Sequence, residues 1–454
     1  MDKPQQPSTS GQTATDARGT EILQVFDNAF GSLLKKDPAA FELKFRKMAA
    51  SAFAFYRGSA CLFYHDLQKK QEQDAFLNEQ TAHVWIHGDL HAENFGTYMG
   101  SHGRLLFSVN DFDEAYIGPF TWDLKRFVAS IALTGYANAL SDQQIDKLIQ
   151  RYAVAYREHI HTIAASSKEE EFQFTLDTAD GPVLQALRSA RQNNRTDLLK
   201  SMTEVRDFER RFIRSSGVVE LDQQSREKVE AAFKTYLSTL PETNQPSPTA
   251  HRIKDVVGRR GVGIGSAGLP SYNILLEGKS EALENDIVLY MKQSQPAAVS
   301  PHVTGGTAQS HFHHEAHRTV LSQRALQVHT DPWLGWTELD GVGYLVAEVS
   351  PYAADYEWSR NNRKDMAQVA ADLGRATAMM HGAGDDDSRH SNLVPFSPEK
   401  AIDEAISKNE DSFKSYLIDF AHKYAGQVRQ DHDVFVHLFR NGHIPGLPID
   451  DDKE

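Results

Sequence analysis

The spacing of apolar residues changes twice along the 454-residue chain, and this change constrains the fold more than any other feature. From Glu21 to about Leu240, and again from Arg363 onward, apolar side chains recur mostly at helical spacing. Between these regions, short runs such as "SYNILLEG" and "DIVLYMKQ" are rich in Val, Ile, Leu and Tyr and are separated by glycines. One helix, His313–His329, is expected before the last strand. The sequence therefore predicts an α+β protein.

A segment rich in proline, serine and threonine, "STLPETNQPSPTAH" (Ser238–His251), is the best candidate for a linker. The stretch "NNRTDLLKSMTEVRDFERRFI" before it is expected to be helical. A chain of this length can form two lobes. The predicted organisation is a flexible tail (1–20), a helical lobe (21–250), a β-rich lobe (251–350) and C-terminal helices that complete the helical lobe (351–445).

The composition excludes several classes of function. A formal net charge of −14 argues against nucleic acid or an acidic membrane as the main partner, because binding phosphates requires a basic surface. The single cysteine, Cys61, rules out an intramolecular disulfide and favours a reducing compartment. The polar first twenty residues do not resemble a signal peptide, and no run of apolar residues is long enough to span a membrane. A cytoplasmic protein is therefore expected, while its oligomeric state is not indicated.

Two strand-like runs near the front of the chain each end in a polar cluster. "AHVWIH" leads into "HGDLHAEN", which contains His87, Asp89 and Asn94, and "RLLFSVN" leads into "NDFDE", which contains Asp111 and Asp113. If the two strands pair, these side chains meet. The amide oxygen of Asn94 and the carboxylates of Asp111 and Asp113 are of the kind that binds Mg²⁺, and a carboxylate outside the metal site could accept a proton from an attacking hydroxyl. Taken singly, each residue could equally cap a turn.

A glycine-rich stretch follows the linker, with glycines at positions Gly258, Gly261, Gly263, Gly265 and Gly268. The pattern G-x-G-x-x-G alone is weak. Here a proline and a strand-like run follow it, whereas a dinucleotide-binding loop would open a helix. Strand, glycine loop and strand is the arrangement that covers nucleotide phosphates in kinases. The alternative is an ordinary glycine-rich hairpin.

Lys292 ends the apolar run "IVLYMKQ" and could reach the phosphates of ATP, although a lysine there could also be a surface residue. Kinase lysines usually pair with a carboxylate of the next helix, and Glu315 is the only acid in that helix. The same segment contains several histidines that raise the alternative of a zinc site: His311, His313, His314 and His317. "HEAH" does not match H-E-x-x-H, because Arg318 stands where the second histidine is required.

The segment "WIHGDLHAENF…VNDFDEAYIGPFTWDLKR" resembles the catalytic segment of aminoglycoside phosphotransferases and choline kinase-like enzymes. The resemblance implies that Asp89 is the catalytic base and that Asn94 and Asp111 bind metal. It assigns His87 to the catalytic loop in a structural role, and it implies that Asp123 of "WDLKR" helps to hold that loop. ATP and Mg²⁺ are the cofactors that follow from it.

More narrowly, "FAFYRGSA", "HGDLHAENFG", "VVGRRGVGIGSAG" and "DPWLGW" resemble the bacterial family called domain of unknown function 2252, from about Phe53 to about Asp385. The order of the motifs departs from ordinary kinases, because the acidic loops precede the glycine loop and Lys292. "LGRATAMMHGAG", which comes last, resembles the helix that leads into the catalytic loop of phosphotransferases. The resemblance thus predicts a protein kinase-like bilobal fold in circularly permuted order. It does not explain Arg57, which could bind phosphate or substrate or pair with a core carboxylate.

The leading hypothesis is an ATP- and Mg²⁺-dependent phosphotransferase acting on a hydroxyl of a small molecule or a protein. The alternatives are a catalytically idle ATP-binding regulator and an AMP transferase. A metallophosphoesterase is suggested by "GDLH" but lacks the further motifs that such enzymes require. The acceptor is not indicated, and its binding walls are expected within Phe172–Leu240.

Overall fold

The computed structural model describes residues 9–70, 73–166, 172–242, 251–260, 267–303, 309–358, 361–384 and 393–447. Its α-helices are α1 (Thr9–Lys36), α2 (Pro38–Met48), α3 (Ala52–Gly58), α4 (Ala60–Lys70), α5 (Phe120–Ala137), α6 (Asp142–Ala164), α7 (Gly181–Ala190), α8 (Arg195–Met202), α9 (Gln223–Leu237), α10 (Glu315–Leu326), α11 (Met366–Gly382), α12 (Pro398–Ser407) and α13 (Glu410–Arg440). Its strands are β1 (Val84–Ile86), β2 (Phe95–Met99), β3 (Leu105–Val109), β4 (Tyr116–Gly118), β5 (Thr203–Arg206), β6 (Glu209–Phe212), β7 (Val218–Val219), β8 (Ile253–Arg259), β9 (Ser271–Leu276), β10 (Ile287–Gln293), β11 (Gly335–Leu339), β12 (Val342–Glu348) and β13 (Ala354–Asp355). The prediction of a mixed α+β protein is confirmed.

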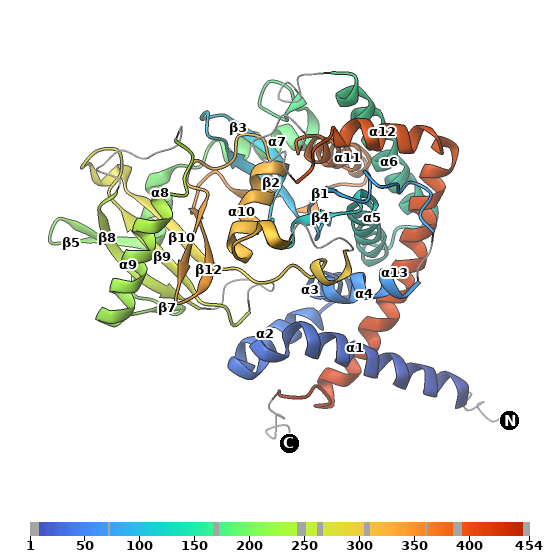
Figure 1. Cartoon of the computed structure of the whole chain (residues 1–454), viewed down its shortest axis with the longest axis horizontal. Coiled ribbons are helices and arrows are strands. Elements are labelled where there is room, and N and C mark those ends of the chain that lie inside the picture. The colour runs from blue at the N-terminus through green and yellow to red at the C-terminus, as the bar shows by residue number, and fades with distance from the viewer. Residues whose placement is uncertain are drawn as a thin grey trace.

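The largest sheet has six antiparallel strands in the order β11-β12-β10-β9-β8-β7. Successive residues of β12 point to opposite faces, because side chains alternate along a strand. Val346 belongs to the apolar cluster that includes Phe233 of α9, whereas Leu345 belongs to the cluster that includes Val320 of α10. A helix therefore covers each face of the sheet, as Figure 1 shows on its left side.

The six-stranded sheet includes elements from before the predicted boundary at residue 250. β7 and α9 both precede that boundary, yet β7 pairs with β8 and α9 contributes to the core of the sheet. The stretch predicted to be wholly helical forms α8 and then the hairpin β5–β6. The hairpin turns at Asp207 and Phe208, which both have positive φ (51° and 62°), and positive φ at both central residues is typical of a tight two-residue turn.

The strands that precede the acidic loops pair differently from the expectation. β1 pairs with β4, and β3 lies in a second sheet of order β13-β2-β3, so the described residues show no pairing of β1 with β3. The loops nevertheless meet. The Asn110 backbone N–H donates to the Asn94 carbonyl at 3.0 Å, and His87 Nε2 lies 2.7 Å from the Asn110 carbonyl oxygen.

Long helices form the rest of the molecule, and α6 packs along α11 (Figure 1). The first and last helices meet in this part, because Arg18 of α1 pairs with Asp66 of α4 at 2.8 Å and with Asp431 of α13 at 2.7 Å. Asp66 and Asp431 are buried, so Arg18 satisfies charges that would otherwise be costly. Among the described helices, none is long and apolar enough to cross a membrane.

Candidate functional site

The loop after β1 is held from behind by Asp123, the fourth residue of α5. The fully buried carboxylate of Asp123 accepts hydrogen bonds from the backbone N–H groups of His87 at 2.7 Å and Gly88 at 2.9 Å. His381, near the end of α11, places its Nε2 3.2 Å from the same carboxylate. Gly88 has φ +77°, and a Cβ there would lie 2.0 Å from the Glu114 carbonyl oxygen. Only glycine fits this position without moving the loop.

Asp89 projects from this loop and is fixed by two contacts. Its Oδ1 accepts a hydrogen bond from Arg126 Nε at 2.6 Å, and its backbone carbonyl accepts one from Asn94 Nδ2 at 2.9 Å. The Oδ2 of Asp89 lies 3.9 Å from His91 Nε2 and accepts no hydrogen bond from the described residues. One oxygen therefore holds the side chain in place and the other remains available.

Arg126 is a member of this site that the sequence reasoning did not assign. It is fully buried on α5, its guanidinium carbon lies 4.3 Å from the centre of the Tyr56 ring, and its Nη2 donates to the Tyr56 carbonyl at 3.1 Å. A signal was present in the sequence. Asp123 and Arg126 are three residues apart in a largely apolar helix, so both face the same side of α5.

Asp111 and Asp113 follow β3 and lie beside Lys292 of β10. Lys292 Nζ forms an ion pair with Asp113. Burial opposes the charge on Lys292, but the carboxylates of Asp113 and Asp111 outweigh it and raise the lysine pKa. Desolvation and the neighbouring Asp113 carboxylate raise the pKa of Asp111. The Asp111 backbone has φ +61°, and its carboxylate makes no hydrogen bond or ion pair with any residue the structure describes.

Glu315, the expected partner of Lys292, is engaged elsewhere. It is the first residue of α10 and accepts a hydrogen bond from Arg318 Nε at 2.7 Å. Arg318 is buried and also donates to the carbonyl oxygens of Ala115 and of Asp113, the latter at 2.8 Å. The residue of α10 that reaches the acidic loop is therefore Arg318, which binds the backbone of that loop and not Lys292.

The glycine loop is only partly described. Gly261, Gly263 and Gly265 lie outside the described residues. Gly258 is the last residue but one of β8 and lies beside β7, where a Cβ would lie 3.2 Å from Val219 Cβ. Gly268 has φ +74°, and its Cβ position is 3.4 Å from Asp37 Cβ, so the end of the loop contacts the start of α2.

The histidines near α10 have structural contacts. His313 and His317 stack with ring centres 4.6 Å apart, and His314 caps α10 by accepting a hydrogen bond from the His317 backbone N–H at 3.1 Å. Within the described ranges, no group of three His, Cys, Asp or Glu side chains is arranged to hold a metal ion. This finding argues against a zinc site among these residues. It does not argue against Mg²⁺, which needs only one or two carboxylates together with substrate phosphates.

A cavity of about 590 Å³ opens beside the acidic loops. Asp89, Asp111 and Asp113 line it, and so do side chains of α1–α4 and of residues 293–298. The acceptor walls were expected within Phe172–Leu240, but none of the residues lining this cavity comes from there. Its size is typical of a small-molecule site.

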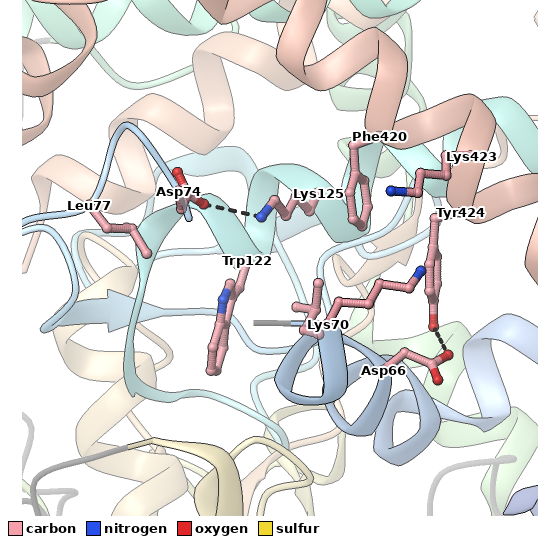
Figure 2. Close-up of a pocket in the computed structure, with 10 residues that line it drawn as sticks. Asp66, Lys70, Asp74, Leu77, Trp122, Lys125, Phe420, Lys423 and Tyr424 are labelled. Carbon is pink, nitrogen blue, oxygen red and sulfur yellow. Dashed lines mark hydrogen bonds and ion pairs between the residues drawn. The ribbon is translucent and has the colours of Figure 1, made fainter. Parts of the chain in front are cut away.

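A second, smaller hollow of about 180 Å³ lies between α4, α5 and α13 (Figure 2). Figure 2 shows Lys125 directed at Asp74, and their Nζ and Oδ2 atoms are 3.1 Å apart. The same Asp74 oxygen accepts a hydrogen bond from Thr121 at 2.8 Å. These contacts attach the start of α5 to the segment before β1. Asp123 in the same part of α5 holds the loop that carries Asp89, so the residues around this hollow help to fix that loop.

Comparison with known protein families gives one match, over residues 36–438, to the family described as "Uncharacterized protein conserved in bacteria (DUF2252)". The comparison with curated proteins gives no match, and neither does the comparison with solved structures. The matched region includes the loop of Asp89, the loop of Asp111 and the strand of Lys292. The chain therefore belongs to the bacterial DUF2252 family.

Proposed function

We propose that this protein is an ATP- and Mg²⁺-dependent phosphotransferase that acts on a hydroxyl group of a small molecule. The observation that carries the proposal is the ion pair between Lys292 and Asp113. It joins the end of a strand in the six-stranded sheet to an acidic loop 179 residues earlier in the chain. A lysine beside a pair of aspartates at the junction of a sheet and a helical body matches the phosphate-binding and metal-binding elements of kinases.

A protein kinase-like fold in permuted order accounts for the positions of these elements. In that fold the helix corresponding to α11 leads directly into the catalytic loop. Here α11 lies near the end of the chain, yet a Cβ at Gly384 would lie 2.7 Å from Trp85 Cδ1 in β1. The α11 residue His381 also contacts Asp123, which holds the loop. The end of α11 therefore lies next to β1 although the chain does not run directly from one to the other, as expected after permutation.

The reaction assigns one role to each described side chain. Lys292 would pair with the ATP phosphates, and Asp89 Oδ2 would receive the proton of the acceptor hydroxyl. As the acceptor oxygen bonds to the γ-phosphorus, the bond from that phosphorus to the bridging oxygen breaks and ADP leaves. Arg126 holds Asp89 in place through its other carboxylate oxygen. His87, through its contact with the Asn110 carbonyl, positions one acidic loop against the other.

The donor set fits Mg²⁺. Asn94 Nδ2 is used by the Asp89 carbonyl, so its Oδ1 is the atom left for a metal, and the Asp111 carboxylate has no partner among the described residues. Asp113, the third expected ligand, is engaged by Lys292. Burial first, and then the negative charge of Asp113, raise the pKa of Asp111, and a divalent cation would relieve the charge repulsion. The metal would supply neutralisation of charge on the phosphates.

The proposal is tested by calorimetric titration with ATP and Mg²⁺, followed by a mass-resolved screen for phosphorylated products from cell extract. We expect Lys292→Met to weaken ATP binding at least tenfold, while Lys279→Met, an exposed control beyond the end of β9, leaves it unchanged. Asp89→Asn should abolish turnover and leave the Kd of ATP nearly intact. If the parent protein does not bind ATP with Mg²⁺, the proposal fails.

One observation favours a second candidate, an ATP-binding regulator without turnover. Lys292 lacks the helix carboxylate of active kinases, because Glu315 is bound to Arg318. The two candidates share ATP binding and differ in the effect of Asp89→Asn. A product that forms with the parent chain and disappears with this variant excludes the regulator.

A further inference from the structure

Lys44 of α2 lines the same cavity as Asp89 and Asp111. Only 5% of Lys44 is exposed. Its ammonium lies 4.0 Å from the centre of the Phe30 ring and 5.7 Å from that of Phe41. These aromatic faces attract a cation but do not neutralise it. The cavity is therefore bordered by a positive charge as well as by the acidic loops.

Lys44 differs from Arg57, the other lysine or arginine that lines this cavity, in having no carboxylate partner. Arg57 pairs with Glu93, and His65 Nε2 lies 2.9 Å from a Glu21 carboxylate oxygen. Lys44 makes no hydrogen bond or ion pair with any part of the chain that the structure describes. Burying an ammonium group without a counter-ion is unfavourable, so an anion bound here would offset that cost.

The nearby acids do not serve as this counter-ion. The carboxylate of Asp89 is already bound by Arg126, and that of Glu114 accepts a hydrogen bond from the Ala298 backbone N–H. Burial lowers the pKa of Lys44 to about 8, and the attraction of Cys61, Glu114 and Asp89 only partly compensates. Lys44 remains mostly protonated at neutral pH and available to an external anion.

We propose that the acceptor is a small hydroxyl-bearing anion whose carboxylate or phosphate pairs with Lys44 while its hydroxyl lies at Asp89. This assignment rests on the proposed phosphotransferase function. Phe30, beside Lys44, lines the cavity together with Leu33 and Pro296, so a nonpolar portion of the acceptor is also accommodated. The chain as a whole carries a charge of −14, so attraction of an anion depends on this local cation and not on the overall field.

The test is isothermal titration of the full chain, free of nucleotide, with three probes that share a hydroxyl group. Glycerol 3-phosphate and glycerate carry an anion, and glycerol is their neutral counterpart. We expect both anions to bind and glycerol not to bind. Lys44→Met should weaken anion binding by about tenfold or more, because a charged hydrogen bond is lost. Lys47→Met, an exposed lysine on the same helix, should leave it unchanged.

A parallel titration with ATP and Mg²⁺ separates this inference from the proposed function. We expect Lys44→Met to leave the Kd of ATP unchanged. A loss of ATP affinity would overturn the assignment, since Lys44 would then hold the nucleotide. Failure of both anions to bind, or equal binding by Lys44→Met, also overturns it, even if Lys292-dependent ATP binding is observed. Anion binding at Lys44 without ATP binding would support the anion site and refute the phosphotransferase.

Discussion

Replacing Lys44 by methionine should stabilise the folded protein, since Lys44 is a buried cation without a counter-ion. Its pKa falls from 10.5 to about 8 on burial, a difference of about 2.5 units, and each unit corresponds to about 1.36 kcal/mol. The charged form in the folded state is thus disfavoured by about 3.4 kcal/mol. Loss of the attraction to the Phe30 ring subtracts about 1 to 2 kcal/mol. We therefore expect Lys44→Met to increase the free energy of unfolding by about 2 kcal/mol at pH 7.

The lowered pKa of Lys44 also predicts how the stability of the parent protein changes with pH. Between pH 8 and 10.5 the unfolded parent chain holds the Lys44 proton and the folded chain does not, so parent stability rises with pH across this window. The methionine variant lacks this rise, and its advantage should disappear by pH 10.5. Urea unfolding in phosphate-free buffer at several pH values measures both effects, with Lys47→Met as the control. A variant that is less stable than the parent at pH 7, by an amount independent of pH, would show that Lys44 has a counter-ion in the folded chain.

Three further predictions concern the supports of the site and the sheet. Arg126→Leu removes the buried partner of the Asp89 carboxylate, and urea unfolding should show a loss of about 3 to 5 kcal/mol; a loss below 1 kcal/mol would contradict this. Gly88→Ala places a Cβ 2.0 Å from the Glu114 carbonyl oxygen and should lower the melting temperature far more than Gly103→Ala, where φ is +69° but nothing lies within 4 Å. Burial raises the pKa of Glu348 from 4.5 to about 7, so the folded state binds more protons and parent stability falls as pH rises through this range. Glu348→Gln should reduce this fall in urea unfolding at pH 5 and 8, and an unchanged slope would contradict it.

Elements with strong periodicity could be predicted from the sequence. The helix expected at His313–His329 is observed at Glu315–Leu326, and the runs "SYNILLEG" and "DIVLYMKQ" contain β9 and β10. In each case the local pattern and the tertiary environment favour the same structure, because one face or both faces are buried throughout.

The hairpin β5–β6 could not be predicted in this way. Its charged residues favour helix locally, but Phe212 is buried in an apolar cluster with residues of the large sheet, and Arg210 pairs with the buried Asp286 at 3.0 Å. These contacts join segments far apart in the sequence, and such contacts override weak local propensity. The three-residue strand β4 is similarly too short to leave a pattern, whereas β1, of the same length, lies within the predicted strand-like run "AHVWIH".

The sequence indicated the acids of the site and Lys292, but not its other cations. The acidic loops stand out because polar side chains follow apolar strands, and the resemblance implies for Asp123 a supporting role that agrees with its bonds to His87 and Gly88. Lys44 and Arg318 lie in helices whose sequences do not indicate which of their charged residues are buried. Burial of one lysine among several on α2 is decided by packing against other elements, which a single sequence does not report.

The contact between His381 and Asp123 has a consequence for the order in which the protein is made. The two residues are 258 positions apart, so at about 5 to 20 residues per second the ribosome needs roughly 13 to 50 s to synthesise the second after the first. During this interval the Asp89 loop is already outside the ribosome, but the helix that completes its support does not yet exist. A nascent chain that ends before α11 therefore carries every acidic residue of the site without the geometry to use it. The loop that carries Asp89 is therefore fully supported only after α11 has been synthesised.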